Sequence, residues 1–166
     1  MDTYTYQIAV AGDFRVLDTE KVMAPVNNFC QKLCGDVFPS LRKHNLRFNL
    51  AESVKNSKMT IQFAIQELCR KENYSFETKF MRRHSLSFFG MNAMVSEMLE
   101  DADRVFYLRL EWEAQYNKQD KVTQRILDQA SNLQIPITYF TYSSLMVLRD
   151  VRYTLGDPLE KRIGIV

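Results

Sequence analysis

The stretch Tyr6-Gln7-Ile8-Ala9-Val10-Ala11-Gly12-Asp13-Phe14-Arg15 decides the fold class of this chain. Residues 6–10 are mostly apolar and β-prone, and a glycine shortly after such a run is typical of the end of a buried strand. Residues 18–37 follow, with Asp18 as a candidate N-cap and apolar side chains every three or four positions, which predicts a helix. A buried strand, a glycine turn and a helix together indicate the first unit of an α/β fold.

The same alternation continues through most of the chain. Further strands are predicted at residues 46–50, 74–80, 104–110 and 136–140. Further helices are predicted at residues 53–68, 92–99 and 122–133. Because strands and helices alternate, and right-handed crossovers join parallel strands, we expect an open, mostly parallel, five-stranded sheet with helices on both faces. The simplest strand order is 3-2-1-4-5.

The remaining segments are predicted to connect or extend this sheet within one domain, residues 1–166. Residues 81–89 are expected to form a loop, and the polar residues 111–121 a flexible connection. Residues 142–166 form a C-terminal extension in which a short helix at 144–149 and an extended piece at 162–166 are the candidate elements.

Composition excludes several classes of protein. Apolar residues make up 46% of the 166 residues and charged residues 25%, with a net charge of +2. These values are those of a globular chain rather than a disordered one, and no global basic field attracts nucleic acid. No apolar run approaches the roughly 20 residues of a membrane-spanning helix. The N-terminus lacks the pattern of a secretory signal, so we expect a cytoplasmic protein without a membrane partner.

The predicted strand order places a switch point between the first and fourth strands, where ligands of open α/β sheets bind. Gly12, Asp13 and Arg15 follow the first strand and are the first candidates for ligand contact. The alternative is an ordinary strand-to-helix turn with solvated charges, because the three-glycine dinucleotide fingerprint is absent. Neither the cysteines nor the two histidines have metal-ligand spacing, so no metal and no cofactor are expected.

Two further clusters are candidates for chemistry. The basic and aromatic segment at residues 79–89 offers Lys79, Arg82, Arg83 and His84 for contact with an anion or a nucleic acid. The alternative is a surface loop whose apolar residues reach into the core. Near the fourth strand, Glu97, Glu111 and Glu113 are candidate nucleophiles or bases for a sugar or nucleoside substrate, or else solvated acids. Asp101 and Asp103 are expected to cap helix and strand ends.

Three stretches of the chain carry a resemblance to a known family: the opening strand and glycine turn at residues 6–15, residues 90–106 around Gly90-Met91-Asn92-Ala93-Met94, and residues 122–137 ending in Ile135-Pro136-Ile137. They resemble the SLOG superfamily of Rossmann-like nucleotide-binding domains, and most closely its YspA-like branch. The resemblance implies a nucleotide or nucleoside ligand. It assigns ligand contact to the following residues: Gly12, Asp13, Arg15, Gly90, Asn92 and Thr123.

The chain also departs from the family pattern. Residues 52–57 contain no glycine where the family has a glycine-rich phosphate turn. Met91 and Val122 stand where the family has arginine and glycine, and such side chains would crowd a phosphate.

Three hypotheses therefore stay open. The first is a protein that binds a nucleotide or nucleoside derivative without catalysis. The second is an accessory interaction protein, of the kind that phages or mobile elements encode, which binds a host protein or nucleic acid through a degenerate Rossmann-like fold. The third is an enzyme of the nucleoside deoxyribosyltransferase or N-glycosidase kind.

Overall fold

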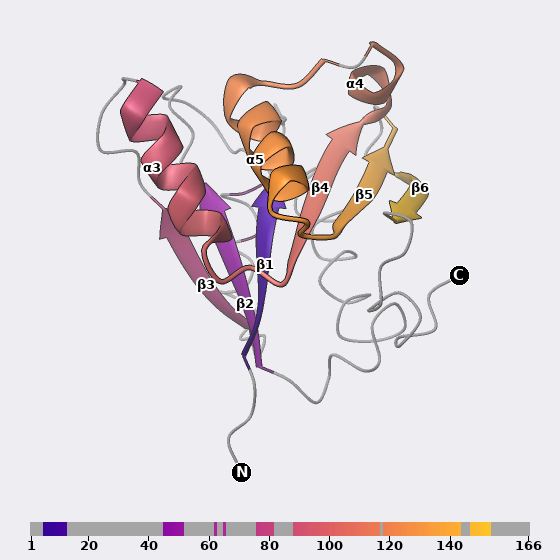
Figure 1. Cartoon of the computed structure of the whole chain (residues 1–166). Coiled ribbons are helices and arrows are strands. Elements are labelled where there is room, and N and C mark those ends of the chain that lie inside the picture. The colour runs from indigo at the N-terminus through magenta and orange to yellow at the C-terminus, as the bar shows by residue number, and fades with distance from the viewer. Residues whose placement is uncertain are drawn as a thin grey trace.

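The computed structural model describes residues 5–12, 45–51, 62, 65, 76–81, 88–116, 118–143 and 147–153. Within them, one sheet of six strands runs in the order β3-β2-β1-β4-β5-β6 (Figure 1). The strands are β1 (Thr5–Ala11), β2 (Asn45–Ala51), β3 (Phe76–Met81), β4 (Arg104–Leu110), β5 (Ile137–Tyr142) and β6 (Leu148–Tyr153).

The first five strands are parallel to one another, and β6 runs antiparallel to β5. The predicted mostly parallel α/β architecture is therefore confirmed, with β3, β2, β1, β4 and β5 in the expected sequence along the sheet. The predicted count of five strands is wrong, because β6 extends the sheet beyond β5.

The sixth strand corrects the prediction for the C-terminal extension. A helix was expected at residues 144–149, yet β6 begins at Leu148. Around this turn the Ser143 N–H donates to the Val147 carbonyl at 2.8 Å, and the Val147 N–H donates to the Ser143 hydroxyl oxygen at 3.2 Å. These two bonds return the chain antiparallel to β5. The extended piece predicted at residues 162–166 lies outside the described residues.

Three helices are described: α3 (Phe88–Leu99), α4 (Glu111–Tyr116) and α5 (Lys121–Asn132). Helices α3 and α5 cover the same face of the sheet (Figure 1). Helix α3 lies on β2 and β3 and helix α5 on β1, and their apolar side chains form one core cluster with residues of β1 to β5. Gln62 and Ile65 are helical and buried. Otherwise the predicted helices at residues 18–37 and 53–68 lie outside the described residues.

Helix α4 corrects another expectation, because residues 111–121 were predicted to be a flexible connection. The segment begins with a helix directly after β4 and continues into α5. Asp120 caps α5 by accepting a hydrogen bond from the Thr123 N–H at 2.5 Å. Such a cap compensates for one of the N–H groups that a helix start leaves without an intrahelical partner.

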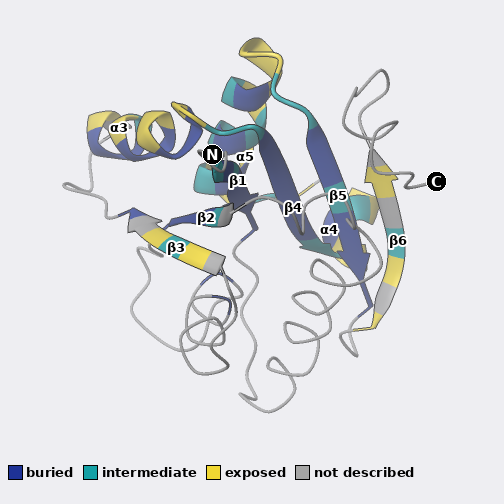
Figure 2. Cartoon of the chain, turned by 90° about the horizontal axis from the view of Figure 1, so that it is seen from below, coloured by how far each residue is buried: buried dark blue, intermediate teal, exposed yellow. Residues whose placement is uncertain are grey.

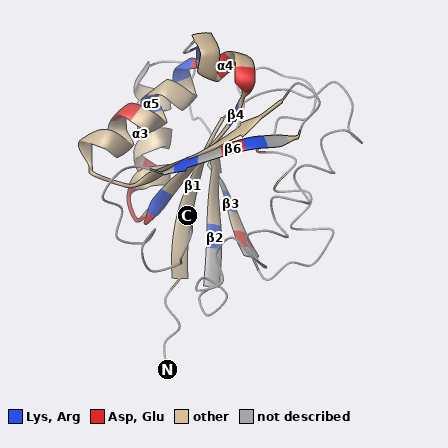
Figure 3. Cartoon of the chain, turned by 90° about the vertical axis from the view of Figure 1, so that its right-hand side faces the viewer, with Lys and Arg blue, Asp and Glu red and all other residues tan. Residues whose placement is uncertain are grey.

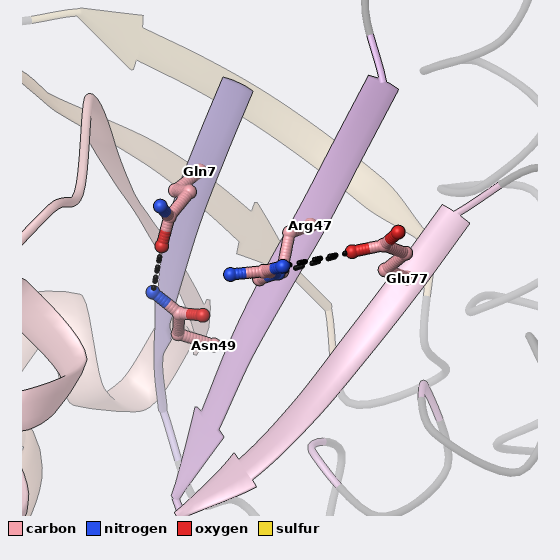
Figure 4. Close-up of polar contacts among 4 residues, drawn as sticks. All are labelled: Gln7, Arg47, Asn49 and Glu77. Carbon is pink, nitrogen blue, oxygen red and sulfur yellow. Dashed lines mark hydrogen bonds and ion pairs between the residues drawn. The ribbon is translucent and has the colours of Figure 1, made fainter. Parts of the chain in front are cut away.

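The centre of the sheet is buried on both faces, whereas its edges carry exposed residues (Figure 2). Strands β1 and β4 are apolar along most of their length, as central parallel strands must be. Towards the β3 edge, Arg47 of β2 forms an ion pair with its register partner Glu77 at 3.0 Å (Figure 4). Next to this pair, the Asn49 amide donates to the Gln7 side-chain oxygen at 3.3 Å.

The turn before β4 is anchored to β1 by an aspartate. Asp103 accepts a hydrogen bond from the Gln7 N–H at 2.9 Å, and its own N–H donates to the Gln7 carbonyl at 2.8 Å. Asp103 therefore has the capping role that the sequence predicts. Among the described residues, no helix combines the length and the apolar character that crossing a lipid bilayer requires.

Candidate functional site

The candidate site lies at the carboxyl edge of the sheet, where β1 and β4 are neighbours. The connection from β1 proceeds towards β2 on one side, and the connection from β4 proceeds towards β5 on the other. In an open parallel sheet this reversal leaves a crevice beyond the strand ends, which is the usual place for a ligand. Gly12 follows β1 at this edge, and α4 follows β4.

Gly12 is required here by the close approach of β4. Its φ is +114°, and a Cβ at this position would lie 2.1 Å from the carbonyl oxygen of Leu108. Only glycine tolerates both the backbone conformation and this contact. The glycine therefore allows β1 to end against the backbone of β4.

Both backbone polar groups of Gly12 are bonded to protein. Its N–H donates to the Thr123 hydroxyl oxygen at 3.2 Å, and its carbonyl accepts from the Gln62 side-chain amide at 2.8 Å. The Gln62 side-chain oxygen also accepts from the Ala51 N–H at 2.5 Å. Gln62 thus bridges the ends of β1 and β2, and Thr123 connects β1 to the start of α5.

A buried tyrosine–glutamate pair is the most unusual polar feature at this edge. The Tyr107 hydroxyl donates to a carboxylate oxygen of Glu113 at 2.9 Å, and both residues are buried. The pair connects β4 to the first turn of α4. The Glu113 carbonyl also accepts from the Lys118 N–H at 3.1 Å, which holds the chain after α4.

The surroundings of Glu113 favour its protonated form. Burial raises the pKa of Glu113 from its ordinary 4.5 to about 7. The hydrogen bonds from the Tyr107 hydroxyl and the Leu110 N–H oppose this rise, as does the charge of Arg109, whereas Asp120 adds to it. Burial and the Glu113 carboxyl also raise the pKa of Tyr107, so the phenol stays protonated and is the donor. A carboxyl group with a pKa near neutrality can give or take a proton at physiological pH.

Arg109 places a positive charge beside this pair. Its guanidinium lies 5.7 Å from the ring centre of Tyr107 and 4.9 Å from that of Tyr139. Its Nε donates to the Thr141 hydroxyl oxygen at 2.9 Å. All these side chains share one face because residues two apart in a strand point the same way. Arg109 is only partly buried, so the site presents a fixed cation that solvent reaches.

Helices α3 and α5 meet through a polar contact close to the predicted binding residues. The Arg125 Nε donates to the Asn92 side-chain oxygen at 2.7 Å. Gly90 is buried at the start of α3, two residues before Asn92. The contact fixes the side chain of Asn92 against α5.

The structure brings some of the predicted site residues together. Gly12 and Thr123 contact each other, and Asn92 contacts α5 through Arg125, two positions after Thr123. Lys79 is exposed on β3. The other predicted contact residues lie outside the described residues: Asp13, Arg15, Arg82, Arg83 and His84.

Among the three candidate glutamates, the structure separates one from the others. Glu97 and Glu111 are exposed, whereas Glu113 is buried against Tyr107. The sequence did not point to Tyr107, Arg109 or Tyr139. The available signal was the alternation in residues 104–110, which places a tyrosine hydroxyl and an arginine on the same face at the carboxyl end of a buried strand.

The part of the chain that the structure describes contains no group of three or more histidine, cysteine, aspartate or glutamate residues able to hold a metal ion. No protein-family model matches the chain, and no curated protein or solved structure matches it significantly. The resemblance to the SLOG superfamily therefore stays a prediction, and the function must be argued from the site itself.

Proposed function

We propose that this chain binds a nucleotide or nucleoside derivative at the carboxyl edge between β1 and β4. The observation that carries the proposal is the group formed by Tyr107, Glu113 and Arg109 at the end of β4. A glutamate at this edge is suited to accept hydrogen bonds from ribose hydroxyls, and a partly exposed arginine is suited to a phosphate. The resemblance to SLOG domains supports the same class of ligand.

The contacts of Gly12 change which residues are expected to meet this ligand. Its N–H donates to Thr123 and its carbonyl accepts from Gln62. The Gly12 N–H is therefore already used within the protein and does not point to a phosphate. Met91 is buried, and Val122 packs against the core, so both contribute to packing at positions where the family pattern has arginine and glycine. We therefore assign ligand recognition mainly to Glu113 and Arg109 rather than to the glycine turn.

Trp112 provides a direct test, because it is the only tryptophan of the chain and precedes Glu113. Adenosine, AMP, ADP and ADP-ribose are each titrated while its fluorescence emission is followed, with thermal shift as a second readout. We expect saturable binding of at least one compound. Binding is expected to weaken by at least tenfold in Glu113→Gln, and the preference for phosphorylated compounds to be lost in Arg109→Gln.

Glu111→Gln is the matched control, because it removes a carboxylate from the same helix at an exposed position. It is expected to bind like the unmodified chain. If the folded chain binds none of the four compounds, or if both glutamate variants behave alike, the proposed site is wrong.

The second candidate function is that of an interaction protein, and the exposed aromatic side chains of α4 favour it. Trp112 and Tyr116 are 49% and 64% exposed and lie four residues apart, hence on one face of the helix. Exposed tryptophan and tyrosine are typical of binding hot spots. Affinity capture from a host lysate with the unmodified chain and with a Trp112→Ala, Tyr116→Ala double variant tests this role. The unmodified chain should capture a specific host protein or nucleic acid, and the double variant should not capture it.

An enzyme acting at the glycosidic bond is the third candidate, and Glu113 is the carboxylate best placed for it. Release of free base from nucleosides and deoxynucleosides, followed by chromatography, measures this activity. Activity that survives in Glu113→Gln would exclude a catalytic role for this residue.

A further inference from the structure

Strand β6 forms one end of the sheet. It pairs with β5 on one side, and no described strand pairs with its other side. The strand crosses the face of the molecule shown in Figure 3, with basic residues along it. A strand edge of this kind presents N–H and C=O groups in a row that can pair with a further strand.

Strand β6 carries an acidic and a basic side chain two residues apart, Asp150 and Arg152. Asp150 and Arg152 point to the same face of the sheet, and the Arg152 Nε lies 2.6 Å from an Asp150 carboxylate oxygen. The Asp150 side chain is 43% exposed and the Arg152 side chain is 73% exposed. Asp150 and Arg152 can therefore interact with charged side chains of another strand that lies beside β6.

Symmetry limits how this strand can pair with its own copy. Facing residue pairs in an antiparallel ladder alternate between hydrogen-bonded and non-hydrogen-bonded pairs. A two-fold axis perpendicular to the sheet makes two pairs equivalent only if they are of the same kind. The axis must therefore pass between a residue and its own copy. The axis can thus pass through the pair formed by any residue of β6 and its copy, and centring on 149 would oppose two arginines. Centring on 150 would oppose two aspartates, and centring on 152 would oppose two arginines. Centring on 151 places each Asp150 opposite an Arg152.

We propose that β6 pairs antiparallel with β6 of a second copy of this chain, in the register centred on Val151. The sheets of the two copies then join edge to edge, and two cross-strand pairs of opposite charge form symmetrically. Facing pairs of opposite charge stabilise a sheet, whereas facing pairs of like charge destabilise it. A single strand pair buries little surface, so the dimer is expected to be weak and to form with increasing concentration. This proposal is independent of the ligand site.

Charge reversal tests the register directly. Sedimentation velocity of the full chain, up to about 100 µM, is expected to show a monomer–dimer equilibrium. Asp150→Arg and Arg152→Asp each create two like-charged facing pairs and should weaken the dimer by about tenfold or more. An equimolar mixture of these two variants restores opposite charges at both facing positions, so a heterodimer should form.

The double variant Asp150→Arg, Arg152→Asp separates this effect from the pair within one chain. It keeps an opposite-charge pair on its own strand, so it should fold and dimerise like the unmodified chain. The two proteins should not dimerise with each other, because their mixed pairs oppose like charges; a fluorescent label on one of them reports this. A monomer at all concentrations, a dimer unaffected by the single reversals, or free mixing of the double variant with the unmodified chain would each overturn the proposal.

Discussion

Replacing Glu113 with glutamine is expected to stabilise the folded chain above neutral pH. The reason is that Glu113 is buried, with a pKa of about 7 in place of 4.5. Between these two values the folded state holds a proton that the unfolded state releases. The stability of the unmodified chain therefore falls as the pH rises through this window, and the full penalty is present above about pH 7.

The size of the effect follows from the two pKa values. At about 1.4 kcal/mol for each pH unit, a rise from 4.5 to about 7 corresponds to about 3 kcal/mol of lost stability at pH 8 and to none at pH 4. Glutamine resembles the protonated carboxyl and does not titrate. The stability of Glu113→Gln relative to the unmodified chain should thus increase by about 3 kcal/mol from pH 4 to pH 8. Any constant effect of the amide on hydrogen bonding leaves this difference unchanged.

Urea denaturation followed by circular dichroism at a series of pH values measures the difference. Glu111→Gln is the control, because it removes an exposed carboxylate from the same helix, and its curve should parallel that of the unmodified chain. If the curves of Glu113→Gln and the unmodified chain are parallel from pH 4 to pH 8, the Glu113 carboxyl does not carry the burial penalty and the reasoning is refuted.

Three other substitutions probe the same edge of the sheet by denaturant titration. Gly12→Ala should destabilise the chain by at least about 2 kcal/mol, because the new Cβ meets the Leu108 carbonyl oxygen at a positive φ. Thr123→Val should cost about 1–3 kcal/mol by leaving the Gly12 N–H unpaired, and Thr123→Ser should cost less because the hydroxyl remains. Asp120→Ala should cost about 1 kcal/mol through loss of the α5 cap, with Asp120→Asn recovering most of it.

Strands β1 and β4 of the parallel sheet were predictable from the sequence because they are buried over most of their length. Such strands appear as short apolar runs, whereas the edge strand β3 alternates apolar and charged residues, with Glu77 and Lys79 exposed. The order of the parallel strands was expected as the simplest doubly wound arrangement of alternating strands and helices. Strand β6 escaped prediction because its sequence, Leu-Arg-Asp-Val-Arg-Tyr, carries the charges of an edge strand and lacks an apolar run.

The switch point between β1 and β4 was predictable from the sequence, but the set of side chains that meet at the end of β4 was not. Glu113 lies in the run Glu111-Trp112-Glu113, in which sequence alone does not distinguish the buried acid from the exposed one. The two acids differ in the structure because the Tyr107 hydroxyl donates to Glu113. This contact depends on how α4 is oriented after β4. The expectation that residues 111–121 are flexible failed for the same reason, because tertiary contacts fold this polar segment.

The close approach of Gly12 to Leu108 has a consequence for how such chains diverge. Selection on folding alone is enough to retain this glycine, since any larger residue collides with the backbone of β4. A lineage can therefore lose its ancestral ligand, and mutate the loops that held it, while the glycine persists. Among distant relatives, a glycine at the end of the first strand would then indicate only that two strands lie close together. Substitutions at Glu113 and Arg109 would be a better indication that the ligand has changed.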